Sequence, residues 1–168
     1  MGKCLDSMTL GECAEFLAAR LVERAADMGK TVCTAESCTA GMVASTIAGV
    51  PGASAVLRGG AVTYCDEVKR RVLGVSEATL AEYTAVSTET AGEMAHGALE
   101  LFCADVAVSL TGYAGPGGGT ERDPAGTVYM PQTCRNPYDV TLPKTCRNPD
   151  DVTLLQPRRC NPAATLTM

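Results

Sequence analysis

Ser37 has neighbours that suit an activated hydroxyl group. It lies in the segment Thr34–Gly41, between the β-branched residues 31–32 and an apolar, small-residue segment at 42–47. This order predicts a strand, a tight turn and a helix, which places Ser37 at a helix N-terminus, where free N–H groups and the helix dipole favour negative charge. Such a position suits an oxyanion or a phosphate. It equally suits an ordinary helix cap, because serine is a common capping residue.

A base that activates this serine would have to be a lysine. His96 is the only histidine, and it lies inside a predicted helix, so a Ser-His-Asp triad has little support. A lysine whose ammonium loses its proton in a partly desolvated site can activate a serine instead. Lys69 is the candidate, with Tyr64 a short distance upstream. The basic run that begins at Lys69 also fits the solvated face of an exposed helix.

Three segments with polar or glycine residues follow predicted strands, at residues 36–39, 63–69 and 111–120. Ligands of α/β sheets bind outside the carboxyl ends of the strands, so these segments could converge on one site. The glycines at 115–119 could present N–H groups to a phosphate. They form neither a P-loop nor the G-x-G-x-x-G pattern, and they also fit a flexible turn.

Hydrophobic periodicity and capping signals predict alternating strands and helices. The predicted helices cover residues 8–29, 38–48, 66–71 with Asp66 as its cap, a segment from 76, and 87–102. The predicted strands cover residues 31–35, 54–64, 105–110 and 126–130. This alternation predicts an α/β domain with helices packed on a largely parallel sheet.

Composition and charge narrow the class of protein. The chain has 168 residues, of which 46% are hydrophobic, as expected for one globular domain. No apolar run approaches the roughly 18 residues of a membrane span, and no secretory signal is evident, so we expect a cytoplasmic protein without a membrane partner. The net charge of −5 argues against general nucleic-acid binding.

The nine cysteines form no C-x-x-C pair. With a single histidine beside them, no metal site is expected. We interpret them mainly as reduced, small apolar side chains, of which Cys38 and Cys65 adjoin the candidate site.

Residues 131–168 lack helical and strand periodicity. The stretch 133–142 recurs twelve residues later at 145–154, and two such short units with Asn-Pro breaks cannot bury a core. We therefore predict a folded domain over residues 1–130 and an irregular, repeat-containing tail over 131–168. The repeated Cys-Arg-Asn-Pro is either an interaction motif or a duplication without function, and a misread reading frame would also account for the tail.

Further short stretches occur in a fixed order along the chain. They are Thr34-Ala-Glu-Ser-Cys-Thr39, Val50-Pro-Gly52, Gly60-Ala-Val-Thr-Tyr64 followed by Lys69, Leu73-Gly-Val75, Ala85-Val-Ser87, Met94-Ala95 with Gly97-Ala98, Thr111-Gly112, Ala114-Gly-Pro116, Gly118-Gly-Thr120, Pro124 and Gly126-Thr-Val128. With these stretches the chain resembles the CinA C-terminal domain family, the nicotinamide-nucleotide amidases (NMN deamidases), from about Leu17 to Tyr129.

The resemblance implies a three-layer α/β/α sandwich with a mainly parallel or mixed sheet. It also implies hydrolysis of the carboxamide of nicotinamide mononucleotide to nicotinic acid mononucleotide and ammonia, without a metal or cofactor. In that reaction Ser37 would be the nucleophile, Lys69 its base, and Tyr64 a partner that orients or shares the proton. The residues implied to position the substrate are Glu36, Cys38, Thr39, Thr111, Gly112, Gly115, Gly117, Gly118 and Gly119. The nucleotide phosphate would bind the glycine loop, Arg58 or Arg122.

The sequence departs from the family pattern in several places. Ala40 adds a methyl group where the family has glycine, Asp66 replaces a neutral amide near the lysine, Tyr113 replaces an isoleucine, and Asp123 replaces a cation. The repeat-containing tail stands where the family has a further strand and a C-terminal helix. Sheet surface left exposed in this way leaves three alternatives, an incomplete fold, rescue by a homo-oligomer, or marginal stability. A second function therefore stays open, that of a catalytically weak or inactive relative that binds a nucleotide or a partner protein.

Overall fold

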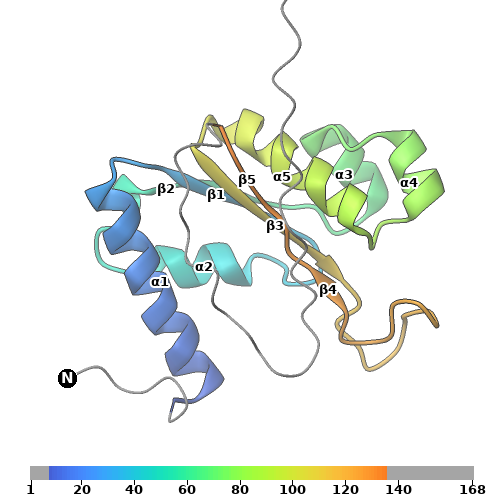
Figure 1. The fold of residues 1–168 in the computed structure, drawn as a ribbon, viewed down its shortest axis with the longest axis horizontal. Coiled ribbons are helices and arrows are strands. Elements are labelled where there is room, and N and C mark those ends of the chain that lie inside the picture. Colours follow the sequence, from blue (N-terminus) through green and yellow to red (C-terminus); the bar gives the residue numbers. More distant parts are fainter. Residues whose placement is uncertain (1–7, 136–168) are drawn as a thin grey trace, which may run out of the picture.

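A computed structural model describes residues 8–135 of the chain as a central sheet with helices on both faces (Figure 1). The helices are α1 (Leu10–Asp27), α2 (Met42–Ala48), α3 (Asp66–Leu73), α4 (Glu77–Tyr83) and α5 (Thr88–Phe102), with a 3-10 turn at Ala53–Ala55. The strands are β1 (Val32–Glu36), β2 (Leu57–Val62), β3 (Val106–Gly112), β4 (Val128–Tyr129) and β5 (Gln132–Cys134). Of the repeated stretches in the predicted tail, all but residues 133–135 lie outside the described residues.

The sheet has the strand order β2-β1-β3-β4, and β5 also pairs with β3. Strand β1 runs parallel to both of its neighbours, while β4 and β5 run antiparallel to β3. The sheet is therefore mixed, and the prediction named a mainly parallel and a mixed sheet as the alternatives. In the parallel part, Glu36 at the end of β1 pairs with Val62 of β2 and with Leu110 of β3. The carboxyl ends of three adjacent strands consequently meet at one edge, which confirms the predicted convergence.

Helices α1 and α2 cover one face of the sheet, and α3 and α5 cover the other, with α4 packed on α5 (Figure 1). The predicted three-layer sandwich is thus confirmed for the described residues. The core under α1 and α2 is formed by Ala18, Val22, Ala25, Val32, Ile47, Ala53 and Val56. The core under α3 and α5 includes Cys33, Ala35, Ala61, Leu73, Met94, Ala98 and Ala107.

Strand β5 corrects the prediction that the chain becomes irregular after residue 130. Residues Gln132–Cys134 pair with Val106–Val108 of β3. Between β4 and β5, the Pro131 carbonyl accepts a hydrogen bond from the Ser109 N–H at 3.1 Å. Three residues are too few to show a side-chain period, and their pairing is made by the backbone, so no sequence pattern marked this strand. The sheet therefore extends past the predicted domain boundary.

Most helix starts agree with their capping signals. Thr9 and Glu12 form a capping box on α1, and the Ser76 and Ser87 side chains cap α4 and α5 as predicted. The prediction that Asp66 caps α3 is wrong, because Cys65 holds the cap position without a side-chain hydrogen bond. Asp66 is the first residue of the helix, and its carboxylate faces Lys69.

Helix α3, which carries Lys69, approaches α5 closely at Gly97. A Cβ atom at Gly97 would overlap the carbonyl group of Leu73, the last residue of α3. Glycine is required here because backbone, rather than a flexible side chain, fills the space. The position of Lys69 thus depends on a glycine in α5, the helix against which α3 packs.

We expect Gly97→Ala to lower the free energy of unfolding by about 1–3 kcal/mol, because α3 and α5 must separate to admit the methyl group. Gly92→Ala in the same helix is the matched control. No atom lies within 4 Å of a Cβ built at Gly92, so this change should be neutral or stabilise by up to about 1 kcal/mol through helix propensity. Urea denaturation of both variants measures the difference, and equal midpoints would contradict the packing argument.

Candidate active site

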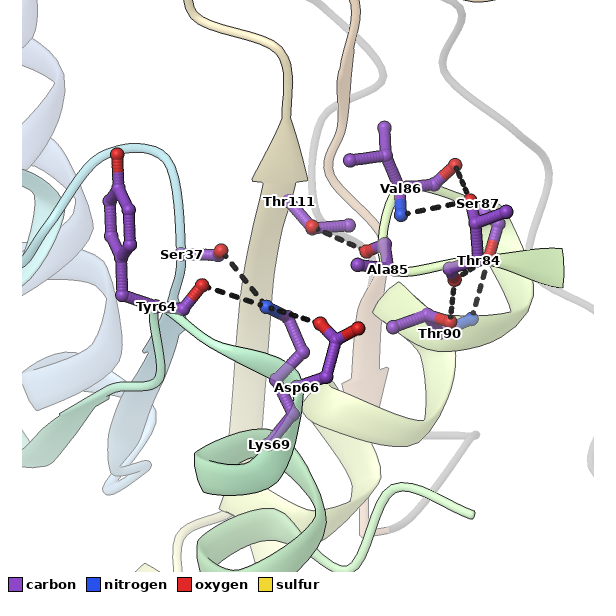
Figure 2. Close-up of polar contacts among 10 residues, drawn as sticks. All are labelled: Ser37, Tyr64, Asp66, Lys69, Thr84, Ala85, Val86, Ser87, Thr90 and Thr111. Atoms are coloured by element: carbon purple, nitrogen blue, oxygen red, sulfur yellow. Dashed lines mark hydrogen bonds and ion pairs between the residues drawn. The ribbon is translucent and has the colours of Figure 1, made fainter. Parts of the chain in front are cut away.

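Ser37 and Lys69 lie against each other at the carboxyl edge of the sheet (Figure 2). The Lys69 Nζ donates a hydrogen bond to Ser37 Oγ at 3.2 Å and to the main-chain carbonyl of Tyr64 at 3.3 Å. Only 1% of Lys69 and 7% of Ser37 is exposed. The structure therefore brings together the predicted nucleophile and base. The solvated helix face is formed by Arg70 and Arg71, whereas Lys69 turns into the protein.

The surroundings of Lys69 favour its neutral form. Burial lowers the pKa of the Lys69 amine below its ordinary value, because the charged form loses its hydration. The Asp66 carboxylate, 3.7 Å from Nζ, opposes this shift, and Cys65 and Cys38 oppose it more weakly. A lysine with a lowered pKa can accept a proton from a hydroxyl hydrogen-bonded to it.

Tyr64 contributes to this cluster with its backbone, and the predicted role of its phenol is not supported. The side chain is 72% exposed, and its hydroxyl points away from Lys69 (Figure 2). Tyr64 lies in the turn between β2 and α3, where the chain directs its carbonyl to the amine. The phenol thus stands at the rim of the site, apart from the Ser37–Lys69 pair.

Glu36 is fully buried and holds the segment that follows β1. Its two carboxylate oxygens accept five hydrogen bonds, from Thr34 Oγ1 (3.0 Å), Thr39 Oγ1 (2.7 Å), Gly41 N (3.0 Å), Val43 N (3.1 Å) and Ala44 N (2.8 Å). With no exposed surface, Glu36 positions the segment that carries Ser37. Its implied contact with a substrate stays a prediction.

The same contacts correct the predicted start of the second helix. Helix α2 begins at Met42 and not near Cys38, and its cap residue Gly41 makes no side-chain hydrogen bond. The N–H groups at the start of α2 are satisfied by Glu36 instead. Ser37 is therefore not a helix cap, and its hydroxyl is available to Lys69.

Burial by itself would raise the pKa of the Glu36 carboxyl. The hydrogen bonds from Ala44, Thr39, Val43 and Thr34 outweigh that effect, and the pKa lies below its ordinary value. Glu36 is thus a buried anion in the folded protein, and hydrogen-bond donors and the N-terminus of α2 stabilise its charge.

The turn between β1 and α2 is tight and partly strained. Ala40 has a φ of +50° and Gly41 a φ of +94°, and an alanine in this left-handed region is unfavourable. Thr39 donates to Glu36 and so supports the turn, while half-buried Cys38 follows Ser37 directly. Burial raises the pKa of the Cys38 thiol, which keeps it protonated beside the serine.

Thr111 ends β3 next to Ser37, but its hydroxyl is used within the protein. It donates to the carbonyl of Ala85 at 2.7 Å (Figure 2). The adjacent Thr84 has a φ of +67°, and its carbonyl accepts from Thr90 Oγ1 at 2.6 Å and from Ser87 Oγ at 3.3 Å. Thr111 therefore fixes the turn 84–87 beside the site, a contact that no motif in the sequence indicated.

The glycine-rich loop starts at Tyr113, because Thr111 and Gly112 belong to β3. Gly112 is required by close packing, since a Cβ there would overlap the Thr127 carbonyl. Gly115, Gly117, Gly118 and Gly119 are exposed in a loop that follows β3 at the carboxyl edge. Their predicted contact with a substrate stays a prediction.

The two arginines considered for the phosphate are placed differently. Arg58 is the second residue of β2, and the four residue steps to Val62 put it roughly 13 Å from the carboxyl end of the strand. Arg122 is exposed in the loop, where its guanidinium lies 4.0 Å from Asp123. Asp123 in turn accepts a hydrogen bond from the hydroxyl of Tyr129 in β4 at 2.6 Å, so this carboxylate already has a partner within the protein.

Within residues 8–135, no group of three or more His, Cys, Asp or Glu side chains could hold a metal ion. None of the described helices is long and apolar enough to span a membrane.

The fold and site define a three-layer α/β domain with a buried serine–lysine pair at the carboxyl edge of its sheet. The CinA C-terminal domain model matches residues 14–155, and the chain belongs to this family. A CinA-like protein of Chloroherpeton thalassium is 54% identical over 100 residues, which are 60% of this chain and 24% of that protein. A CinA-like protein of Myxococcus xanthus is 46% identical over 125 residues, 74% of this chain and 30% of that protein.

Solved structures agree with this assignment. The competence/damage inducible protein CihA of Agrobacterium tumefaciens has a TM-score of 0.71 and 45% identity, covering 73% of this chain and 74% of that one. A CinA superfamily protein of Escherichia coli has a TM-score of 0.72 and 36% identity, covering 80% of both chains. The chain spans only about a quarter to a third of the curated relatives it matches.

We expect Glu36→Gln to lower the free energy of unfolding at neutral pH by about 2 kcal/mol or more, because an amide nitrogen cannot accept the N–H bonds of α2. The pKa of Glu36 is lower in the folded state than its ordinary 4.5. Its stabilising contribution is therefore present above the unfolded pKa and is lost as pH falls through the folded pKa.

The stabilities of wild type and Glu36→Gln should accordingly converge on acidification below about pH 4.5. Urea denaturation over a pH series measures this. Glu23→Gln, on the exposed face of α1, is the matched control and should change stability by less than about 0.5 kcal/mol. A constant gap between wild type and Glu36→Gln at every pH would contradict the assigned role.

Proposed function

We propose that this chain is an amidohydrolase that cleaves the carboxamide of nicotinamide mononucleotide to nicotinic acid mononucleotide and ammonia. The observation that carries the proposal is the 3.2 Å contact between the buried Lys69 Nζ and Ser37 Oγ. Membership of the CinA family supports the class of protein. The choice of substrate rests on the resemblance of the sequence motifs to the nicotinamide-nucleotide amidases.

The proposed reaction has two halves. Neutral Lys69 takes the proton of Ser37 Oγ, which attacks the carboxamide carbon. The carbonyl oxygen becomes an oxyanion, for which the N–H groups of the turn after Ser37 that are not already bonded to Glu36 would be the donors. Collapse breaks the C–N bond, and Lys69 returns its proton to the departing ammonia. Water then attacks the Ser37 ester with Lys69 as base, which releases the acid and restores the serine.

Nucleotide binding with weak or no turnover is the second candidate. Asp66 favours it, because its carboxylate 3.7 Å from Nζ stabilises the ammonium form of Lys69. The strained Ala40, three residues after Ser37, points the same way. Both candidate functions predict that the chain binds the nucleotide, and only the amidohydrolase predicts that it turns the nucleotide over. An activity assay therefore separates them.

Ammonia release by the purified full chain tests the proposal. We expect Ser37→Ala and Lys69→Met each to reduce kcat by about a thousandfold or more, as when one member of a nucleophile–base unit is removed. Arg71→Met is the matched control, since Arg71 is an exposed cation on the same helix and should leave activity unchanged. Equal turnover in Ser37→Ala and wild type would refute the nucleophile, and tight nucleotide binding without turnover would favour the second candidate.

Asp66→Asn should lower the pKa of Lys69, because it removes an anion that stabilises the ammonium. The acid limb of kcat/KM should therefore move to lower pH, by less than about one unit, since the Asp66 side chain is largely exposed to solvent. Glu67→Gln, which removes an exposed carboxylate paired with Arg71, should leave the limb in place. An acid limb of Asp66→Asn at the wild-type position or above it would contradict Lys69 as the titrating base.

A further inference from the structure

Three hydroxyl residues, Ser37, Thr63 and Thr111, lie in the same register at the carboxyl ends of three adjacent strands. Because Glu36 pairs with Val62 and Leu110, the residues that follow them also align. The backbone ladder continues past the strands, since Thr63 N donates to the Glu36 carbonyl at 2.8 Å and Ser37 N donates to the Leu110 carbonyl at 2.9 Å. Ser37 thus lies in the middle of a row, between Thr63 and Thr111, with neighbours about 4.8 Å away across the sheet.

The side chains of this row lie on the face covered by α3 and α5. Ala35 and Ala61, two residues earlier in β1 and β2, belong to the core on that face, and side chains two residues apart share a face. The side chains of Ser37 and Thr63 therefore lie on the same face as those of the two alanines. Thr111 agrees with this placement, since Ser109 before it donates to the Ala91 carbonyl of α5.

The three hydroxyls are used in different ways. Ser37 accepts from Lys69, and Thr111 donates to Ala85. Thr63 is fully buried, and over residues 8–135 its Oγ1 is the buried side-chain atom that has no hydrogen-bond partner. An unpaired buried hydroxyl destabilises a fold, and valine would fill the same volume without that cost. The hydroxyl therefore calls for a role outside stability.

Lys69 supplies such a role. An ammonium has three N–H donors, and two of them face Ser37 Oγ and the Tyr64 carbonyl. The Asp66 carboxylate, at 3.7 Å, is beyond hydrogen-bond distance. Thr63 neighbours Ser37 in the row, on the face of the sheet from which Lys69 reaches Ser37, so its unpaired oxygen lies on the same side of the sheet as the group that gains a proton.

We infer that Thr63 is a positioning residue for the Ser37–Lys69 pair, whose hydroxyl oxygen accepts the third N–H of Lys69 once that amine has taken the serine proton. This inference rests on the proposed function. The step moves one proton from Ser37 Oγ to Lys69 Nζ, and Thr63 gains and loses none. Because Thr63 is fully buried, it acts through Lys69 and does not contact the substrate.

Thr63→Val and Thr63→Ser of the full chain test this role. We expect Thr63→Val to be at least as resistant to urea as wild type, while kcat falls at least about tenfold, equivalent to about 1.4 kcal/mol, with KM little changed. Thr63→Ser should retain most of kcat. Thr90→Val, which removes a buried hydroxyl that has a partner at 2.6 Å, is the stability control and should lower the urea midpoint.

A second readout separates this inference from the substrate assignment. The rate at which a fluorophosphonate labels Ser37, followed by intact mass, reports serine activation without any nucleotide. We expect Thr63→Val to be labelled at least about tenfold more slowly than wild type. If wild type labels but releases no ammonia, the proposed function fails and the Thr63 role is still decided by the labelling rates.

Four results would overturn the role of Thr63. They are labelling and turnover of Thr63→Val at wild-type rates, a loss in Thr63→Ser as large as in Thr63→Val, a lower urea midpoint for Thr63→Val, and no labelling of wild-type Ser37. The first shows that the hydroxyl is dispensable. The second and third assign its effect to packing, and the last shows that there is no activated serine to support.

Discussion

The Glu36 carboxylate is the interaction on which the candidate site depends. It joins the end of β1, the turn after it and the start of α2 through five hydrogen bonds in a fully buried position. A helix start otherwise leaves N–H groups without partners, and serine is one of the residues whose side chain commonly accepts hydrogen bonds from them. Because Glu36 does so, the neighbouring Ser37 is released from capping and can turn to the opposite face of the sheet.

Lys69 is held on that opposite face by a second set of constraints. Its helix is pressed against α5, where Gly97 admits the backbone at the end of α3. Burial then disfavours the ammonium, while Asp66 at the rim partly restores it. The balance between these two effects, and not the presence of a lysine alone, sets the pKa of Lys69 and with it how well this amine could serve as the proposed base.

The sequence predicted what depends on local signals. The caps Ser76 and Ser87 and the strand ends that meet at one edge follow from residue types and their spacing. The pairing of Ser37 with Lys69 was one of two alternatives that the spacing allowed, and the resemblance to the family favoured it. The role of Glu36 was not predictable in this way, because its partners lie up to eight residues along the chain and meet it only when the turn folds back.

The contribution of Tyr64 and the inferred role of Thr63 were not predictable for similar reasons. A tyrosine after a strand can direct either its phenol or its carbonyl inward, and the backbone path decides which one contacts the lysine. Thr63 carried no functional signal in the sequence, because a β-branched residue at a strand end already fits strand propensity.

The departures from the family pattern have unequal consequences. Asp123 is engaged by the Tyr129 hydroxyl, which raises the pKa of that phenol and ties the loop to β4. Asp66 alters the charge beside Lys69 without disturbing the 3.2 Å contact. Ala40 keeps the left-handed turn at the cost of strain. The strained Ala40 and the unpaired Thr63 hydroxyl lie close to Ser37, along the chain and across the sheet respectively. Local destabilisation therefore gathers around the candidate site, and the unpaired hydroxyl, unlike Ala40, is not one of the departures from the family pattern.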